Sequence, residues 1–251
     1  MKNNPFDSYP LPDWLQYSME QNIGRKPLWD FPKLPPTPDG FWFQKLEFRN
    51  RSLLLEMFKN DPDPWVDERF KDPKEVYEYV ANLRICMPYS GKHGGCDWLV
   101  MSPERECVGL LHNFDFSREN YGFQHRQCSI GNAFEQACRG TGLPQRIMQH
   151  FQDYLFKTMN RLLLMASVDR GNTRSIRFLE KLGYEERTSD YLDDEEDKPR
   201  KEPENRYFEL FRSRKTRSRV LAYRKKVDEE YREWRATWIK NPDGSYTIPQ
   251  R

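Results

Sequence analysis

The spacing of hydrophobic residues predicts a first strand, then two helices, then a hairpin. Bulky side chains cluster over Phe41–Phe48, which is typical of a strand. Leu53–Phe58 and Pro73–Ile85 have helical character, and the second segment repeats apolar residues at steps of three and four. Two short apolar runs, Trp98–Met101 and Cys107–Leu111, flank a polar turn and predict a hairpin.

A second block of strands and helices follows. Gln127–Phe134 has strand character and precedes a glycine-containing loop. Apolar residues recur every four positions from Ile147, which predicts an amphipathic helix, and Arg161–Val168 is typical of a buried strand. Asn172 can cap a further short helix that Gly183 ends in a left-handed conformation. Strands linked by a crossover helix predict a mixed α/β architecture.

The two ends of the chain differ from this central block. Residues 1–40 combine many prolines, which disfavour a regular helix or central strand, with aromatic residues that predict an arm wrapped on a folded surface. Strand character resumes at Tyr184 and at Tyr207–Phe211, with an acidic loop between them. Apolar and aromatic residues spaced by three and four then predict one long final helix. We therefore expect an arm at 1–40, a domain at 41–212 and a C-terminal helical extension at 213–251.

Composition excludes several classes of protein. The 41 Lys and Arg nearly balance the 39 Asp and Glu, so no net field favours nucleic acid or membrane. The start of the chain lacks a secretory signal pattern, and no segment approaches the roughly 20 apolar residues of a membrane helix. The odd number of cysteines, without a C-x-x-C pair, argues against a disulfide framework or a zinc site. These features predict a soluble cytoplasmic protein without a metal. The cysteines are Cys86, Cys96, Cys107, Cys128 and Cys138. The histidines, to which no metal is assigned either, are His93, His112, His125 and His150.

A short glycine loop carries the most informative chemistry. The run R-G-T-G begins at Arg139 and leads into the predicted helix. Such a loop can direct several backbone N–H groups at one anion, aided by the positive end of the helix dipole, and Gly140 and Gly142 tolerate positive φ. Arg139 can add a charge-assisted contact, so the loop suits a pyrophosphate. A tight turn without a ligand is the alternative reading, and neither nucleotide-binding glycine motif is present.

Two strings around this loop resemble a known family. I-G-N-A-F-E-Q-A-C-R-G-T-G at Ile130–Gly142 and V-D-R-G-N-T-R-S-I-R-F-L-E-K-L-G-Y at Val168–Tyr184 resemble the GNAT superfamily, especially its ribosomal-protein-alanine N-acetyltransferase branch. The similarity covers about residues 127–186. It implies an α/β (α+β) GNAT fold, with a mixed, mostly antiparallel sheet of about six to seven strands splayed at the centre. Helices would lie on both faces, and the C-terminal helix would be an addition.

The resemblance also implies how acetyl-CoA would bind. Backbone groups near the end of the predicted strand would pair with pantetheine as an added strand does, and the glycine loop would cradle the pyrophosphate. The residues placed on pantetheine by this likeness are Asn132, Ala133, Phe134 and Asn172. Those placed on the pyrophosphate are Arg139, Gly140, Thr141, Gly142 and Leu143, while Ser175 would point toward the sulfur.

Three positions depart from the family pattern. Pro144 stands at the last position of the loop and removes one N–H, although proline is tolerated in a first helical turn. Leu179 occupies the place where many members have a tyrosine that protonates the departing thiolate, so Ser175 becomes the candidate for stabilising sulfur. Ser129 stands where the related branch often has glutamate, which makes Glu135 the first candidate base. Glu47 and Asp115 are weaker alternatives for that role.

The resulting hypothesis is an N-acetyltransferase in which an amine of a peptide N-terminus or small molecule attacks acetyl-CoA directly in a ternary complex. The family resemblance leaves the amine and the acyl length open. Leu179 and Ser129 motivate the alternative of a non-catalytic acyl-CoA-binding module. The basic run Arg212–Lys226 motivates an RNA or protein interaction module, but the acids after it favour a solvated helix face. The aromatic stripe of the last helix predicts packing against the arm or a homodimer partner.

Overall fold

The computed structural model describes residues 13–22, 31–86, 94–116, 126–187, 205–241 and 246–247. These residues belong to two compact units that divide between Leu210 and Phe211. The first unit is built on a sheet with helices on both faces. The second consists chiefly of one long helix.

A seven-stranded sheet forms the centre of the first unit, in the order β1-β2-β3-β4-β5-β7-β6. The first four strands are antiparallel neighbours, whereas β5 runs parallel to β4. This arrangement confirms the predicted mixed, mostly antiparallel sheet. The strands are β1 Trp42–Lys45, β2 Gly94–Met101, β3 Cys107–Phe116, β4 Gln127–Phe134, β5 Leu163–Asp169, β6 Glu185–Glu186 and β7 Asn205–Phe211.

The sheet opens between its two parallel strands. β4 and β5 pair through only three residues, and the last of these pairs joins Ser129 to Met165. Beyond this point β4 still pairs with β3, up to Phe134 opposite Gly109. The side of β4 that faces β5 is therefore free of strand pairing from Ile130 onward, which confirms the predicted splay.

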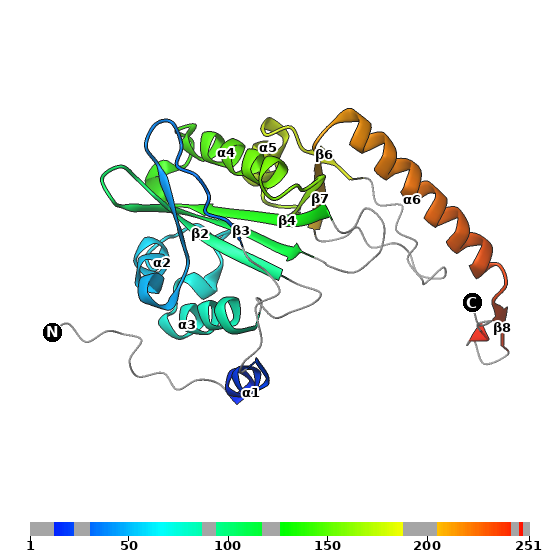
Figure 1. The fold of residues 1–251 in the computed structure, drawn as a ribbon, viewed down its shortest axis with the longest axis horizontal. Coiled ribbons are helices and arrows are strands. Elements are labelled where there is room, and N and C mark those ends of the chain that lie inside the picture. Colours follow the sequence, from blue (N-terminus) through cyan, green and yellow to red (C-terminus); the bar gives the residue numbers. More distant parts are fainter. Residues whose placement is uncertain are drawn as a thin grey trace. The chain divides into compact units, whose positions relative to one another are not determined.

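Helices cover both faces of this sheet (Figure 1). α2, Arg51–Phe58, and α3, Pro73–Ala81, lie on one face, and α4, Leu143–Lys157, and α5, Thr173–Lys181, lie on the other. Each pair buries its apolar stripe against alternate residues of the strands, which is why the sheet has one core on each side. Leu99 and Leu110 contribute to the first core, and Trp98 and Leu111 to the second.

Local signals in the sequence explain several element ends. The Asp72 side chain accepts hydrogen bonds from the backbone N–H groups of Lys74 and Glu75 and so caps α3, with proline in the first turn. Gly183 ends α5 at a φ of 87°. α3 is shorter than predicted because its last turn, Asn82–Cys86, widens into a π-helix. The predicted acidic loop lies outside the described residues.

Part of the N-terminal arm packs on the first unit. Phe31 is buried and meets Trp98 edge to face, with ring centroids 6.1 Å apart. The Tyr154 hydroxyl donates to the carbonyl of Pro32 over 2.5 Å, and His150 Nε2 lies 2.7 Å from the carbonyl of Pro35. The expectation of a wrapping arm therefore holds for residues 31–37.

The expectation that prolines exclude helix from the arm is wrong at one place. Helix α1 spans Asp13–Asn22. It begins immediately after Pro12, and the next proline is Pro27, so the segment between them is free of the residue that blocks helix interiors.

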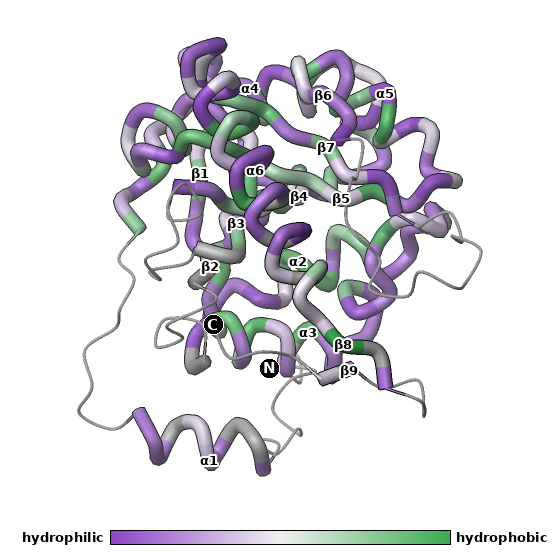
Figure 2. Tube along the Cα trace, turned by 90° about the vertical axis from the view of Figure 1, so that its right-hand side faces the viewer, coloured by the Kyte–Doolittle hydropathy of each residue, from purple (hydrophilic) through white to green (hydrophobic). Residues whose placement is uncertain are grey.

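The second unit is dominated by α6, Arg214–Arg235, which the Ser213 side chain caps. Its polar character is visible in Figure 2. The basic run and the acids after it form i,i+4 ion pairs, including Lys226 with Glu230 at 3.5 Å. Trp234 and Trp238 meet edge to face at 5.0 Å, although Trp238 lies beyond the helix end. Two short strands, β8 Ile239–Lys240 and β9 Tyr246–Thr247, pair with each other. Among the described helices none has the length and apolar character needed to cross a membrane.

The absence of a side chain at Gly109 is predicted to be essential for the packing of the Phe134 ring. A Cβ at Gly109 would lie 2.6 Å from the Phe134 ring, which is itself buried. We expect Gly109→Ala to destabilise the fold by about 1 to 3 kcal/mol through overpacking, lowering Tm by about 2 to 4 °C per kcal/mol. Calorimetry measures this loss. The Gly109→Ala/Phe134→Leu double variant is the control, because a smaller side chain should relieve the clash; strictly additive losses would contradict the contact.

Candidate coenzyme and acyl-transfer site

A cavity of about 440 Å³ lies beside the open half of β4. Its walls come from β4, the glycine loop, the starts of α4 and α5, and the segment 61–67 that follows α2. Most of the predicted coenzyme residues are brought together here. The predicted residues that line the cavity are Asn132, Ala133, Phe134, Arg139, Gly140, Gly142, Asn172 and Ser175.

The glycine loop has the geometry of an anion cradle. Gly140 and Gly142 have φ of 78° and 82°, conformations that L side chains rarely adopt. Thr141 and Leu143 do not line the cavity, because the Thr141 hydroxyl bonds within the loop, donating to Cys138 over 2.7 Å and accepting from Leu143 N–H over 3.3 Å. Within the described part of the chain, the N–H groups of Gly140, Gly142 and Gln145 have no hydrogen-bond acceptor. Three donors thus remain for a ligand although Pro144 has none.

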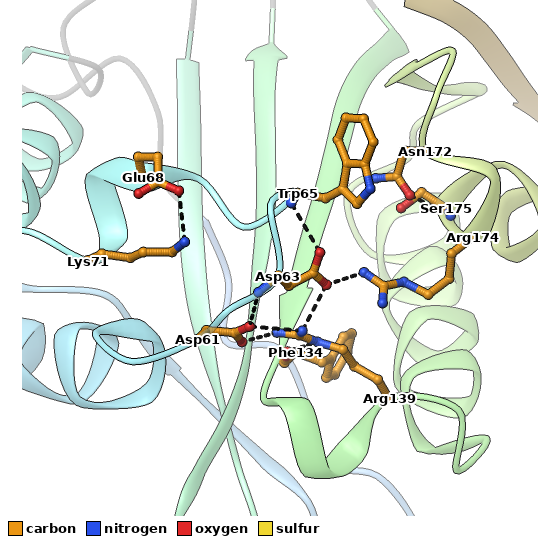
Figure 3. A network of polar contacts seen from close by, with 10 residues as sticks. All are labelled: Asp61, Asp63, Trp65, Glu68, Lys71, Phe134, Arg139, Asn172, Arg174 and Ser175. Carbon is orange, nitrogen blue, oxygen red and sulfur yellow. Dashed lines mark hydrogen bonds and ion pairs between the residues drawn. The ribbon is translucent and has the colours of Figure 1, made fainter.

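The start of α5 forms the opposite wall. Asn172 is buried, and its side-chain oxygen accepts from the backbone N–H of Ser175 over 3.1 Å, so the amide caps the helix. Trp65 lies beside Asn172 and Ser175 (Figure 3). A Cβ at Gly171 would lie only 3.3 Å from the Trp65 ring, so this glycine permits the close approach of the indole.

An ion network joins three elements at the cavity wall (Figure 3). Arg139 donates to the carbonyl of Phe134 over 2.8 Å and to the carboxylates of Asp61, over 3.1 Å, and Asp63, over 2.8 Å. Asp63 also pairs with Arg174 at the start of α5. Arg139 therefore holds the glycine loop to the 61–67 segment, and Asp63 links that segment to α5.

This site belongs to a recognisable family. A family model of the acetyltransferase (GNAT) domain matches residues 41–185. The chain belongs to the GNAT acetyltransferase family. This confirms the resemblance seen in the sequence and identifies the chain as an N-acetyltransferase.

Solved structures of GNAT acetyltransferases share the fold. A ribosomal-protein-S5-alanine acetyltransferase from Vibrio fischeri superposes with a TM-score of 0.50 at 15% identity, over 74% of this chain and 97% of that one. A chimera of the spermidine N-acetyltransferase SpeG from Vibrio cholerae and hSSAT gives 0.50 at 16% identity, over 68% and 95%. Comparison with curated protein sequences gives no match.

Charge pairing tunes the carboxylates of the GNAT site. Burial alone would raise the pKa of Asp61, but hydrogen bonds from Arg139 and the backbone N–H of Asp63 bring it below the ordinary value of 3.8. Burial would likewise raise the pKa of Asp63, but hydrogen bonds from the Trp65 backbone N–H and from Arg174 outweigh burial and bring that pKa below its ordinary value. Both groups are therefore carboxylates at neutral pH. No local pattern in the sequence indicates this network, because the aspartates and Arg139 lie more than 70 residues apart.

A basic helix face also borders the cavity. Arg174, Arg177 and Lys181 of α5 all line it, and their spacing of three and four residues places them on one side of the helix. The spacing could have been read from the sequence. These cations would favour a phosphate-rich ligand.

The candidate base Glu135 does not line the cavity. Its backbone N–H donates to Val108 over 3.0 Å. Its carbonyl accepts from the backbone N–H of Cys138 over 3.0 Å. Burial raises the pKa of the Cys138 thiol, and the Glu135 carboxylate adds to the rise. Glu47 instead accepts from Arg49 at 2.9 Å beyond the end of β1, and the Asp115 side chain lies outside the described part of the structure. Leu179 is buried in the core and supplies no acid.

Asp61 is predicted to stabilise the fold in a pH-dependent manner. Asp61→Asn should lower the free energy of unfolding at pH 7 by about 1.5 to 3 kcal/mol, because Arg139 loses a charged partner. Since the folded-state pKa of Asp61 is lowered, its contribution is complete above the ordinary value of 3.8 and is lost as pH falls through the lowered pKa. Urea unfolding of both proteins across this range should show the difference narrowing in acid.

Asp39→Asn is the matched control for this experiment. Asp39 pairs with Arg146 at 3.4 Å, but its side chain is 47% exposed, against 2% for Asp61. An exposed pair contributes no more than about 1 kcal/mol. Equal losses in the two variants would show that the Asp61 network adds nothing beyond surface charge.

Proposed function

We propose that this chain transfers an acetyl group from acetyl-CoA to an amine of a peptide N-terminus or small molecule, by direct attack within a ternary complex. One juxtaposition supports the proposal above all. The unpaired edge of β4 and the glycine loop line the same cavity, so an extended pantetheine arm and its pyrophosphate can be held at once. No metal is part of the proposal.

Coenzyme binding is proposed to rest mainly on backbone groups. Asn132, Ala133 and Phe134 would pair with pantetheine, and the available N–H groups of the loop would face the pyrophosphate. The Arg139 guanidinium is already bonded to Asp61 and Asp63. We therefore propose that it chiefly shapes the loop and that its contribution to phosphate binding is indirect. Arg177 and Lys181 would add attraction for the phosphates of the nucleotide.

The proposed chemistry is acyl transfer by positioning. A neutral amine attacks the thioester carbonyl, and backbone N–H groups of the open β4 edge stabilise the oxygen that becomes negative. Ser175 lines the cavity from the start of α5 and is proposed to donate to the departing sulfur. A hydroxyl is a weak acid, so its role is hydrogen bonding rather than full proton donation.

Acceptor selection is proposed to fall to the segment after α2. Asp63, Trp65 and Val66 of this segment line the cavity. Pro62 and Pro64 restrict its backbone, and Asp61 and Asp63 accept from N–H groups two residues on. A carboxylate beside an indole suits an amine that carries an apolar or positively charged neighbour.

The alternatives keep specific support. The burial of Leu179 favours a non-catalytic acyl-CoA-binding module, because the usual thiolate acid is missing. A homodimer through α6 stays a proposal, supported by its exposed Leu221 and Val227. RNA binding is less supported, since Lys225 and Lys226 are paired with acids of the same helix. A cytoplasmic location also stays a proposal.

Acetyl-CoA is predicted to raise the melting temperature of the protein. Ligand at 100 times its dissociation constant should stabilise the fold by about 2.7 kcal/mol.

The double variant Arg177→Glu/Lys181→Glu should weaken acetyl-CoA binding at least about 10-fold at low salt. The control Lys59→Glu/Lys157→Glu changes the net charge equally but away from the cavity, and it should leave binding unchanged. Differential scanning fluorimetry with inorganic pyrophosphate as a control measures both. No rise at millimolar acetyl-CoA would refute the coenzyme site.

Turnover is predicted to depend on Ser175. Thiol release from acetyl-CoA should be detectable with amines drawn from alanine-led peptides and polyamines, and Ser175→Ala should lower kcat about 5- to 10-fold, as expected for one neutral hydrogen bond. The Tm rise with acetyl-CoA should be unchanged, because Ser175 is proposed to act on the leaving sulfur. Binding without thiol release for any amine would favour the non-catalytic module instead.

A further inference from the structure

Three residues form a row across the sheet, perpendicular to its strands. Asp97 of β2 lies opposite His112 of β3, and His112 lies opposite Gly131 of β4. Residues that pair in this way project from the same face of a sheet, and here that face is the one covered by α2 and α3. The row ends at β4, in the half of that strand that has no pairing to β5.

A buried carboxylate holds the imidazole of this row. Asp97 is 2% exposed, and its Oδ2 lies 2.7 Å from His112 Nδ1. The Tyr79 hydroxyl bonds to the same carboxylate oxygen. Burial, the largest cause, and the negative charge of Asp97, the second, keep the pKa of Tyr79 well above its usual value. Tyr79 is therefore a hydroxyl donor to Asp97. Nδ1 then carries the hydrogen that bonds to the carboxylate, which leaves Nε2 with its lone pair.

The opposite edge of the imidazole lies against Gly131 of β4. A Cβ at Gly131 would lie 3.3 Å from His112 Cδ2, the ring carbon bonded to Nε2. The cavity lining on β4 begins at Asn132, the next residue along the strand. Strand pairing between β4 and β5 ends at Ser129, two residues before Gly131. His112 does not itself line the cavity, but its side chain is 17% exposed, and Nε2 belongs to the ring edge that lies against Gly131, one residue before the first lining residue of β4.

The direction of the coenzyme places the thioester at that same end. If the chain binds acetyl-CoA as proposed, the pyrophosphate lies at the glycine loop after β4. Pantetheine then runs back along β4 toward the first residues of that strand. Each residue of a strand spans about 3.3 Å, so Gly131 lies about 30 Å or less from Gly140 even in extended chain. The reacting carbon would arrive beside Gly131.

We propose that His112 is the general base of the acyl transfer, with Asp97 and Tyr79 as its positioning residues. This role rests on the proposed function. As the amine nitrogen bonds to the thioester carbon, His112 Nε2 accepts the N–H proton. The carbonyl electron pair then returns, the C–S bond breaks, and the thiolate leaves with the pair and takes up a proton from the histidine or from water. No other reactant is consumed.

Charged and aromatic groups from several elements surround the imidazole. Besides Asp97 on β2 and Tyr79 on α3, the groups that face it are Asp67, whose pKa His112 helps to lower, and Arg69, which pairs with Asp67 and lies over the Tyr79 ring. The Phe70 ring stacks on the imidazole at 5.9 Å and fixes its plane.

The test compares His112→Gln with His150→Gln in the full-length protein. His150 lies on α4, bonded to Pro35, on the face of the sheet opposite to that of His112. The substrate is the amine of highest turnover from the peptide and polyamine panel. His112→Gln should lower kcat about 100-fold and abolish the decrease of kcat at low pH. The KM for acetyl-CoA should change less than twofold. His150→Gln should keep both the rate and the pH profile of the wild type.

Tyr79→Phe is the second variant, because it keeps the buried ring and removes only the hydroxyl. Without that donor, the Asp97 carboxylate attracts the imidazole proton more strongly, so the acid limb of the rate should move to higher pH. A purely structural role for Tyr79 would leave the limb in place. This variant keeps the proposal open to refutation if His112→Gln does not fold.

The outcomes separate this inference from the proposed function. If wild type binds acetyl-CoA and acetylates an amine while His112→Gln does so at an equal rate with an unchanged pH profile, His112 is not the base and only this inference fails. If wild type does not bind acetyl-CoA, or binds it and acetylates no amine of the panel, the proposed function fails first and this role fails with it. A selective loss of kcat and of the acid limb supports the role.

Discussion

The early end of the pairing between β4 and β5 is the constraint on which the site depends. Three residue pairs join these parallel strands, and the backbone groups beyond Ser129 must find other partners or water. Helices pack on both faces of these strands and bury a core on each side. An extended ligand with its own amides can fill the gap, so the fold keeps an unfinished sheet at its centre.

The charge network at Arg139 turns this opening into a defined site. Its guanidinium joins the end of β4, the glycine loop and the segment after α2, while Asp63 extends the connection to α5. Buried ions need well-placed partners, because each carries a desolvation cost. The network therefore specifies one arrangement of the walls of the cavity.

Much of the fold could be predicted from the sequence because its signals are local. The apolar repeat from Ile147 gave α4, and Asn172 with Gly183 gave both ends of α5. The glycines of the loop have the positive φ that their pattern implied. Periodicity could not supply contacts distant in the chain, such as Asp61 with Arg139 or Asp97 with His112. For the same reason, Glu135 followed β4 in the sequence as a candidate base but does not line the cavity.

The packing of the N-terminal arm on α4 also has a consequence for the order of steps in folding. Pro32 and Pro35 are bonded to Tyr154 and His150, which are separated from them by 122 and 115 residues. Closing so long a loop costs chain entropy that only an already formed partner surface can offset. During synthesis this segment leaves the ribosome well before α4 does. The bonds of Pro32 and Pro35 can therefore form only after α4 has been made, so the closing of this segment onto α4 marks a late stage in the maturation of the domain.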